Sequence, residues 1–291
     1  MQFSKTVVII LLAFFVACKN SSTDTGHSIT TNVYGRLAFQ SDRSGNFEIY
    51  FTGSSGTSLD NISQNIFDNT SPSLSLDGEK LVYLSDRDTV RNIFLFQNRI
   101  TTKLLPGISN YDAPRISYAG DEIAFVKNSN IYVMTSGGTG QTALTQTGSD
   151  TSNFSPAFSF DGSNIAFVRT VLHGHSDICM MASSGGAAQN LTVGIGDNLY
   201  PSFSPNGAEI VFTRANHICL LTVATKSVVD LMPDDSLNVN TQPVFSPDGS
   251  RIAFATDRDG NFEIYTMGHD GTGLTNISDN PAIEVCPAWS R

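Results

Sequence analysis

The feature that most constrains the fold of this chain is an internal repeat with a period of 42–45 residues. It is marked by prolines that open short segments of alternating polar and apolar residues: Pro72, Pro114, Pro156, Pro201, Pro243 and Pro287. Most of these segments end in an Asp-Gly or Asn-Gly pair, which favours the positive φ of tight hairpin turns. A repeat of this length indicates a fold built from similar units side by side.

Each unit contains further short apolar segments after the turn. A second segment such as Ile165-Ala166-Phe167 is followed by a third such as Ile264-Tyr265, and we expect a fourth to end near Leu191-Thr192 or Leu274-Thr275. No stretch has a convincing apolar period of 3.6 residues, so helices should be nearly absent. Four short strands recurring in this way are typical of a β-propeller blade.

The repeat is out of phase at its two ends. It begins at a second strand, Leu37-Ala38-Phe39, and ends with a first strand, Pro287-Ala288-Trp289-Ser290. We therefore predict an all-β, six-bladed propeller in which one blade is closed by pairing of the N- and C-terminal strands; seven blades are the main alternative. Closure would pair strand edges that are otherwise exposed, and stacking the blades would bury sheets that are apolar on both faces.

The repeating units carry a family resemblance. The segments Pro243-Val244-Phe245-Ser246-Pro247-Asp248-Gly249 and Asp257-Arg258-Asp259-Gly260-Asn261-Phe262-Glu263-Ile264-Tyr265 resemble the tryptophan-aspartate-like repeat of TolB-type propellers, and the likeness covers residues 34–291. Relatives of this type include binding platforms of the Tol–Pal envelope system, accessory domains of prolyl-oligopeptidase-like and tricorn-like peptidases, and oligogalacturonate lyases. In TolB an α/β domain precedes the propeller. Here only a short polar segment lies between Cys18 and the first expected strand, so by this resemblance we expect that domain to be missing.

The first residues differ from everything that follows. Lys5 is the only charge before an apolar run over residues 6–17, which is too short to span a membrane. The tail Phe15-Val16-Ala17-Cys18 resembles the lipobox of bacterial lipoproteins. We expect a signal peptide at 1–17, a flexible tether at 18–33 and the propeller at 34–291. Lipidated Cys18 would anchor the protein in the cell envelope, at the outer membrane facing the periplasm; an ordinary signal peptide cut elsewhere is the alternative.

Charge and motifs narrow the function. With 17 Lys+Arg against 27 Asp+Glu, the net charge of −10 argues against nucleic-acid partners. Gly-x-Ser-x-Gly, HExxH and phosphate-loop motifs are all missing from the sequence. Three loop histidines, His173, His175 and His217, could meet a transition metal, although solvated loop histidines are the simpler interpretation. We expect no cofactor and leave open a cation on the propeller axis.

The candidate site lies where the chain crosses from one blade to the next. Three residues before the prolines stand Asn69, Tyr111, Asn153, Asn198, Asn240 and Glu284, and Asp112 and Asp197 are flanking carboxylates. These residues either cap turns or line the polar mouth of an axial channel. In the second case, the chain is a non-catalytic binding or scaffold module for an envelope protein or peptide segment. The alternative is a glycan-active lyase or hydrolase with its site in the channel.

Overall fold

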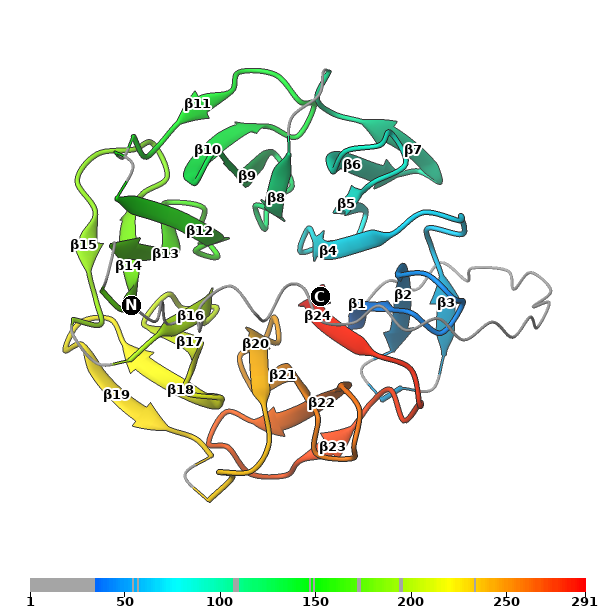
Figure 1. Ribbon diagram of the computed structural model, residues 1–291. Coiled ribbons are helices and arrows are strands. Elements are labelled where there is room, and N and C mark those ends of the chain that lie inside the picture. The colour runs from blue at the N-terminus through cyan, green and yellow to red at the C-terminus, as the bar shows by residue number, and fades with distance from the viewer. Residues whose placement is uncertain are drawn as a thin grey trace, which may run out of the picture.

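The computed structural model describes residues 35–291 except 54, 57, 107–109, 147, 149, 172–173, 194–195 and 233. The described residues contain no helix, and their strands form six four-stranded antiparallel sheets arranged as a ring around a central axis (Figure 1). No helix that could cross a membrane occurs in this part of the chain. The predicted six-bladed, all-β propeller is confirmed. The predicted segments 1–17 and 18–33, with Cys18, lie outside the described residues.

Each blade runs from an inner strand near the axis to an outer strand at the rim (Figure 1). Five blades are consecutive in the sequence: β4 (Asn69–Leu74), β5 (Lys80–Ser85), β6 (Asn92–Gln97), β7 (Ile100–Lys103); β8 (Tyr111–Ile116), β9 (Glu122–Lys127), β10 (Asn130–Thr135), β11 (Thr142–Ala143); β12 (Thr151–Phe158), β13 (Asn164–Val171), β14 (Ser176–Ala182), β15 (Gln189–Asn190); β16 (Asn198–Phe203), β17 (Glu209–Arg214), β18 (His217–Thr222), β19 (Ser227–Asp230); and β20 (Asn240–Phe245), β21 (Arg251–Thr256), β22 (Glu263–Gly268), β23 (Thr275–Asn276). The sixth contains β24 (Glu284–Trp289), β1 (Arg36–Ser41), β2 (Glu48–Gly53) and β3 (Leu59–Asn61).

The sixth blade closes the ring with strands from both ends of the described chain. Strand β24 pairs antiparallel with β1, so that Trp289 lies opposite Leu37 and Glu284 lies opposite Ser41. Trp289 is buried and packs in a cluster with Leu37, Phe39 and residues of the neighbouring blade. The predicted closure is therefore confirmed, and the tryptophan contributes to the contact between the first and last units.

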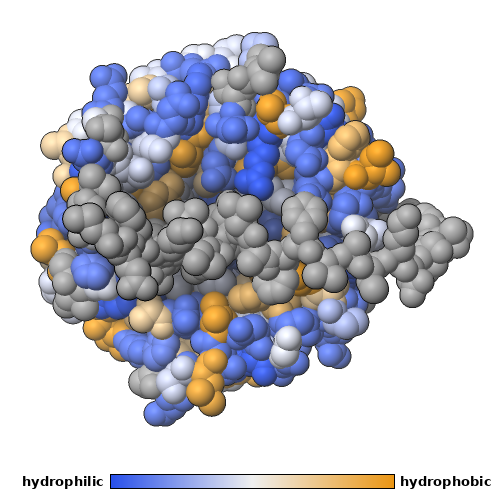
Figure 2. All heavy atoms as spheres, viewed as in Figure 1, coloured by the Kyte–Doolittle hydropathy of each residue, from blue (hydrophilic) through white to orange (hydrophobic). Residues whose placement is uncertain are grey.

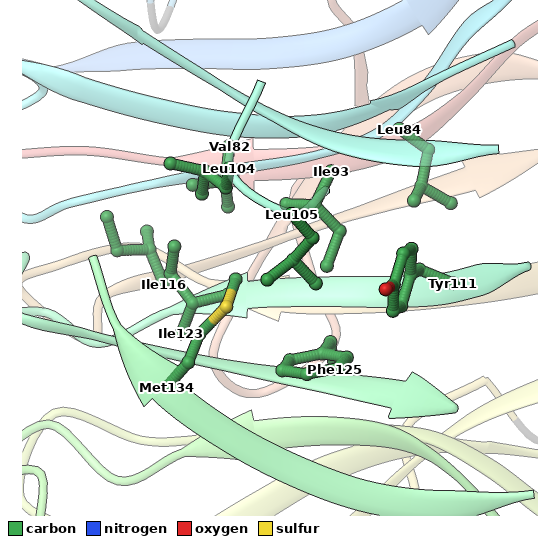
Figure 3. Close-up of a cluster of buried hydrophobic side chains, with 10 residues drawn as sticks. All are labelled: Val82, Leu84, Ile93, Leu104, Leu105, Tyr111, Ile116, Ile123, Phe125 and Met134. Atoms are coloured by element: carbon green, nitrogen blue, oxygen red, sulfur yellow. The ribbon is translucent and has the colours of Figure 1, made fainter. Parts of the chain in front are cut away.

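The hydrophobic core consists of layers between adjacent blades. Figure 3 shows one such layer, in which Leu84 and Ile93 of one blade face Tyr111 and Phe125 of the next. Five similar clusters contain the second-strand triplets that the repeat predicted. Because every second strand is covered on both faces, its consecutive residues are all apolar and buried, as in Leu81-Val82-Tyr83.

The hairpin turns have the geometry that their sequences predict. At the turn after β20, Gly249 has a φ of 73° and the Ser246 hydroxyl lies 2.6 Å from the Asp248 carboxylate. The hydrogen bonds from Ser246 and Ser250 lower the pKa of Asp248. The outer strands differ slightly from the prediction: β15 ends at Asn190, although the backbone N–H of Leu191 still donates to the Ile178 carbonyl.

Every inner strand contains a β-bulge immediately before its proline. At these six positions, the pairing with the second strand shifts register. The bulged residues have φ between 45° and 56°, although none is glycine: Ser71, Ala113, Ser155, Tyr200, Gln242 and Cys286. Such a backbone costs about 1–3 kcal/mol per residue and persists only where the surroundings enforce it. The bulges redirect the inner strands, so they determine which side chains reach the axis.

Candidate binding site at the mouth of the channel

The crossings between blades define one end of the central channel, which we call the mouth. Each crossing loop leads from an outer strand into the next inner strand, and the inner strands β4, β8, β12, β16, β20 and β24 surround the axis (Figure 1). The predicted site residues lie at or near the start of these inner strands. The channel wall and its rim are thus built from six copies of one local structure.

Six of the eight predicted site residues are buried in the protein. Asn69, Asn153, Asn198, Asn240 and Glu284 have no exposed surface, and Tyr111 is 3% exposed. The side chains of the four asparagines bond to nearby backbone: the amide of Asn198, for example, donates to the carbonyls of Ser176 and Gly196, at 2.9 and 3.1 Å. These contacts are the turn-capping bonds that one of the two sequence interpretations predicted.

The other side of each polar residue meets a cation, which the sequence interpretation missed. In four blades a guanidinium donates to the side-chain oxygen of the asparagine: Arg87 to Asn69 at 3.3 Å, Arg169 to Asn153 at 3.0 Å, Arg214 to Asn198 at 2.7 Å and Arg258 to Asn240 at 3.3 Å. In the closing blade, Arg43 forms an ion pair with buried Glu284. One cation per blade also lies over an aromatic ring of that blade: Arg43, Arg87, Lys127, Arg169, Arg214 and Arg258.

The sequence signal for this ring of cations is irregular. Each follows the central aromatic residue of the second strand, but the offset is two residues for Arg169 and four for Arg258. Where Tyr111 replaces asparagine, the Lys127 ammonium lies 5.8 Å from the centre of the tyrosine ring. Cation–aromatic contact therefore replaces the hydrogen bond in that blade.

The two remaining candidates, Asp112 and Asp197, are exposed at the mouth. The Asp112 carboxylate accepts from the backbone N–H of Ala113 at 2.8 Å, and Asp197 accepts from Ser176 at the same distance. The outer surface of both carboxylates stays open to solvent. A molecule at the mouth would therefore meet these two carboxylates before the buried asparagines, whose contact with a ligand remains a prediction.

The histidines occupy separate environments in the described chain. His217 Nδ1 lies 2.6 Å from the Asp230 carboxylate on the paired strand, whereas His175 is exposed and 4.0 Å from Asp197. His173 lies outside the described residues. Across the described positions, no group of three or more His, Cys, Asp or Glu side chains is placed to hold a metal ion.

A small cavity of about 80 Å³ lies between the inner strands. At about 10–15 Å³ per water molecule, this volume corresponds to roughly five to eight waters. Its walls come from five of the six prolines, from four of the bulged residues, and from the residue after each proline, which is Arg115 in one blade. Tyr118, Tyr200 and Cys286 also line it.

Hydrophobic side chains are exposed on several crossing loops around the mouth. Ile66 is 85% exposed before β4, Val193 is 72% exposed before β16 and Leu237 is 94% exposed before β20. The view in Figure 2 shows a mainly hydrophilic face with separate hydrophobic patches toward the rim. A protein partner that covered these loops could bury such side chains as apolar anchors within a polar rim.

Comparisons with known proteins agree on the fold. No family model matches the chain. Among curated proteins, the Tol-Pal system protein TolB of Anaeromyxobacter dehalogenans strain 2CP-C is 44% identical over 46 residues, 16% of this chain and 11% of that protein. The match thus spans about a tenth of the length of that relative.

Solved structures match nearly the whole propeller. TolB from Acinetobacter baumannii has a TM-score of 0.72 at 22% identity, over 90% of this chain and 68% of the other. A structure assigned to TolB of Agrobacterium tumefaciens has a TM-score of 0.68 at 18% identity, over 88% and 99%. An oligogalacturonate lyase in complex with manganese reaches 0.56 at 12% identity, over 82% and 71%. The chain is therefore a six-bladed β-propeller whose fold is similar to that of the TolB propellers.

Proposed function

We propose that this protein is a non-catalytic binding or scaffold module of the bacterial cell envelope, and that the mouth of its channel holds a segment of another protein. The observation that carries the proposal is the exposure of Ile66, Val193 and Leu237 on crossing loops that lead into the inner strands. Buried apolar anchors supply most of the affinity in protein interfaces, and a polar rim supplies specificity. The likeness to TolB propellers supports the same class of function.

Within this proposal, the predicted site residues have two roles. The exposed carboxylates of Asp112 and Asp197 contact the bound segment directly. The buried polar residues Asn69, Asn153, Asn198, Asn240 and Glu284, together with Tyr111, hold the loops that present these contacts. The acidic rim favours a segment with basic residues near its apolar anchors, because charge complementarity speeds encounter and fixes register.

Cross-linking in intact cells tests the proposed surface. The paired change Ile66→Ser with Leu237→Ser should reduce the yield of captured protein by roughly tenfold or more, since removal of interface anchors commonly costs over 1 kcal/mol each. Both side chains are exposed, so the melting temperature should stay near the wild-type value. The matched control is Ile100→Ser with Val229→Ser, on the outer strands β7 and β19, where 65% and 58% of the side chains are exposed.

The outcomes separate the candidate functions. Equal loss of capture in both pairs would mean that the contact is not specific to the mouth, and full capture by the mouth variant would remove the mouth from consideration. Capture of a defined glycan in place of a protein would favour the lyase or hydrolase alternative. The solved lyase structure is the observation that keeps this alternative open.

The proposed lipid anchor has its own test. Cys18 should be the first residue of the mature protein and carry at least two acyl chains, which hold a protein on a membrane where one chain is marginal. Mass spectrometry of the mature N-terminus checks this expectation. Cys18→Ser should move the protein from the membrane fraction to the soluble fraction, while an unmodified terminus downstream of Cys18 in the wild type would contradict the anchor.

A further inference from the structure

The axial cavity contains one cation in an otherwise small-residue layer. The six residues that follow the prolines line it together: Ser73, Arg115, Ala157, Ser202, Val244 and Ala288. Five of these side chains are short, whereas Arg115 is long and charged. Because the layer surrounds the axis, the guanidinium is the one group of this set long enough to extend across the channel.

The positive charge of Arg115 has no close carboxylate partner among the described residues. Its Nη1 donates to the carbonyl of Pro114 at 2.9 Å, and no carboxylate of the described chain lies within 4.0 Å of its guanidinium. Arg115 is partly exposed toward the cavity, and partial burial lowers the pKa of its guanidinium. A half-buried charge gains from a partner of opposite sign, and a guanidinium offers five N–H donors in a planar fork that matches an oxyanion.

The groups around Arg115 suit a negative guest. Cys286, Asp112 and Tyr200 are near enough to act electrostatically on Arg115. Burial is the largest cause that raises the pKa of Tyr200 to about 12 and that of Cys286 to about 11. The tyrosine and the thiol are thus neutral at physiological pH and able to donate hydrogen bonds. Asp112 opposes an anion, but its carboxylate is exposed and bonds to the Ala113 N–H.

We propose that the axial cavity is a binding site for one small oxyanion of carboxylate or phosphate size, held by the Arg115 guanidinium. A cavity of about 80 Å³ has room for one such group. The positive charge on the axis also disfavours the cation that the sequence had left open there. The anion comes either from solution or from an acidic side chain or terminal carboxylate of a segment bound at the mouth.

Melting of the purified protein in sodium formate, compared with sodium chloride at equal ionic strength, tests the site without any partner. The wild type should show a saturable rise in melting temperature, because a ligand that binds only the folded state stabilises it. Arg115→Gln should weaken formate binding by roughly tenfold or more, since a hydrogen bond to a charged group is worth about 1.5–3 kcal/mol. Arg115→Lys should retain part of it. The control is Arg91→Gln, an exposed arginine outside the cavity.

The same measurement decides against the proposal if formate gives no saturable rise or if Arg115→Gln responds like the wild type. Should Arg115→Gln fail to fold, Asp112→Asn decides: loss of a nearby negative charge must tighten formate binding, and an unchanged or weaker affinity would overturn the site. Added formate that lowers protein capture at the mouth would assign the natural anion to the bound segment, whereas unchanged capture would assign it to solution. The site therefore stands or falls separately from the proposed function.

Discussion

Removal of residues 286–291 is expected to abolish cooperative folding of the propeller. This deletion takes away most of β24, including Trp289 and Ala288, which lie opposite Leu37 and Ala38 of β1. Strand β1 would then present an unpaired edge, and the hydrophobic layers on both sides of the closing blade would be exposed to water. Circular dichroism during heating should show no cooperative transition for the truncated protein, whereas removal of residues 19–33 should leave the transition near that of the full chain.

Trp289→Ala is the milder version of the same experiment. Trp289 is 6% exposed, and truncation of a buried tryptophan costs about 3–5 kcal/mol, a large part of the 5–15 kcal/mol by which domains are ordinarily stable. Leu237→Ala is the control, because its side chain is 94% exposed and should change the free energy of unfolding by less than about 0.5 kcal/mol. Near-normal stability of Trp289→Ala would mean that the closing blade contributes little to the ring.

Arg43→Ala is expected to destabilise the closing blade by about 3–5 kcal/mol, the usual cost of leaving one partner of a buried ion pair uncompensated. Glu284 is fully buried and accepts from both Arg43 and the Ser41 hydroxyl. Its second oxygen, Oε2, has no hydrogen-bond partner among the described residues. Loss of Arg43 would therefore leave a buried carboxylate with only the Ser41 hydroxyl as a side-chain donor.

A second change distinguishes charge from packing. Glu284→Gln removes the negative charge and supplies an amide like the asparagines at the same position in other blades, so it should recover part of the stability lost in Arg43→Ala. Chemical denaturation of the two single variants and the double variant gives the coupling energy. If the double variant is no more stable than Arg43→Ala, the cost comes from lost contact with the rings of Phe39 and Tyr50, over which Arg43 lies.

The fold could be predicted from the sequence because several independent features recur with the same period. Proline spacing, hairpin turns and buried triplets such as Ile165-Ala166-Phe167 recur in phase, and the triplets lie in the layers between blades. The ends of the outer strands were less predictable. These strands are short and largely exposed. The apolar residue Leu191 is buried, but it lies one residue beyond the last paired residue of β15.

The site was less predictable for two physical reasons. A polar residue such as Asn198 at a loop can point into the protein or out of it, and only the position of Arg214 shows that it is a buried hydrogen-bond partner. Arg115 is a single departure within the repeat, so no periodic signal marks it. Its significance depends on the ring closure, which brings Arg115 and residues of the other inner strands to the wall of one cavity.

The closing blade also affects how fast the molecule can form. The backbone N–H of Ser290 donates to the Arg36 carbonyl, a contact between residues 254 positions apart. Contacts so distant in the sequence require a large loop to close before they return any energy, and chains dominated by such contacts fold slowly. Five blades can assemble from neighbouring segments, but the sixth must wait for both ends. We expect an open ring with β1 and β24 unpaired to be the last long-lived species on the folding pathway, with its edge strands available to chaperones until closure.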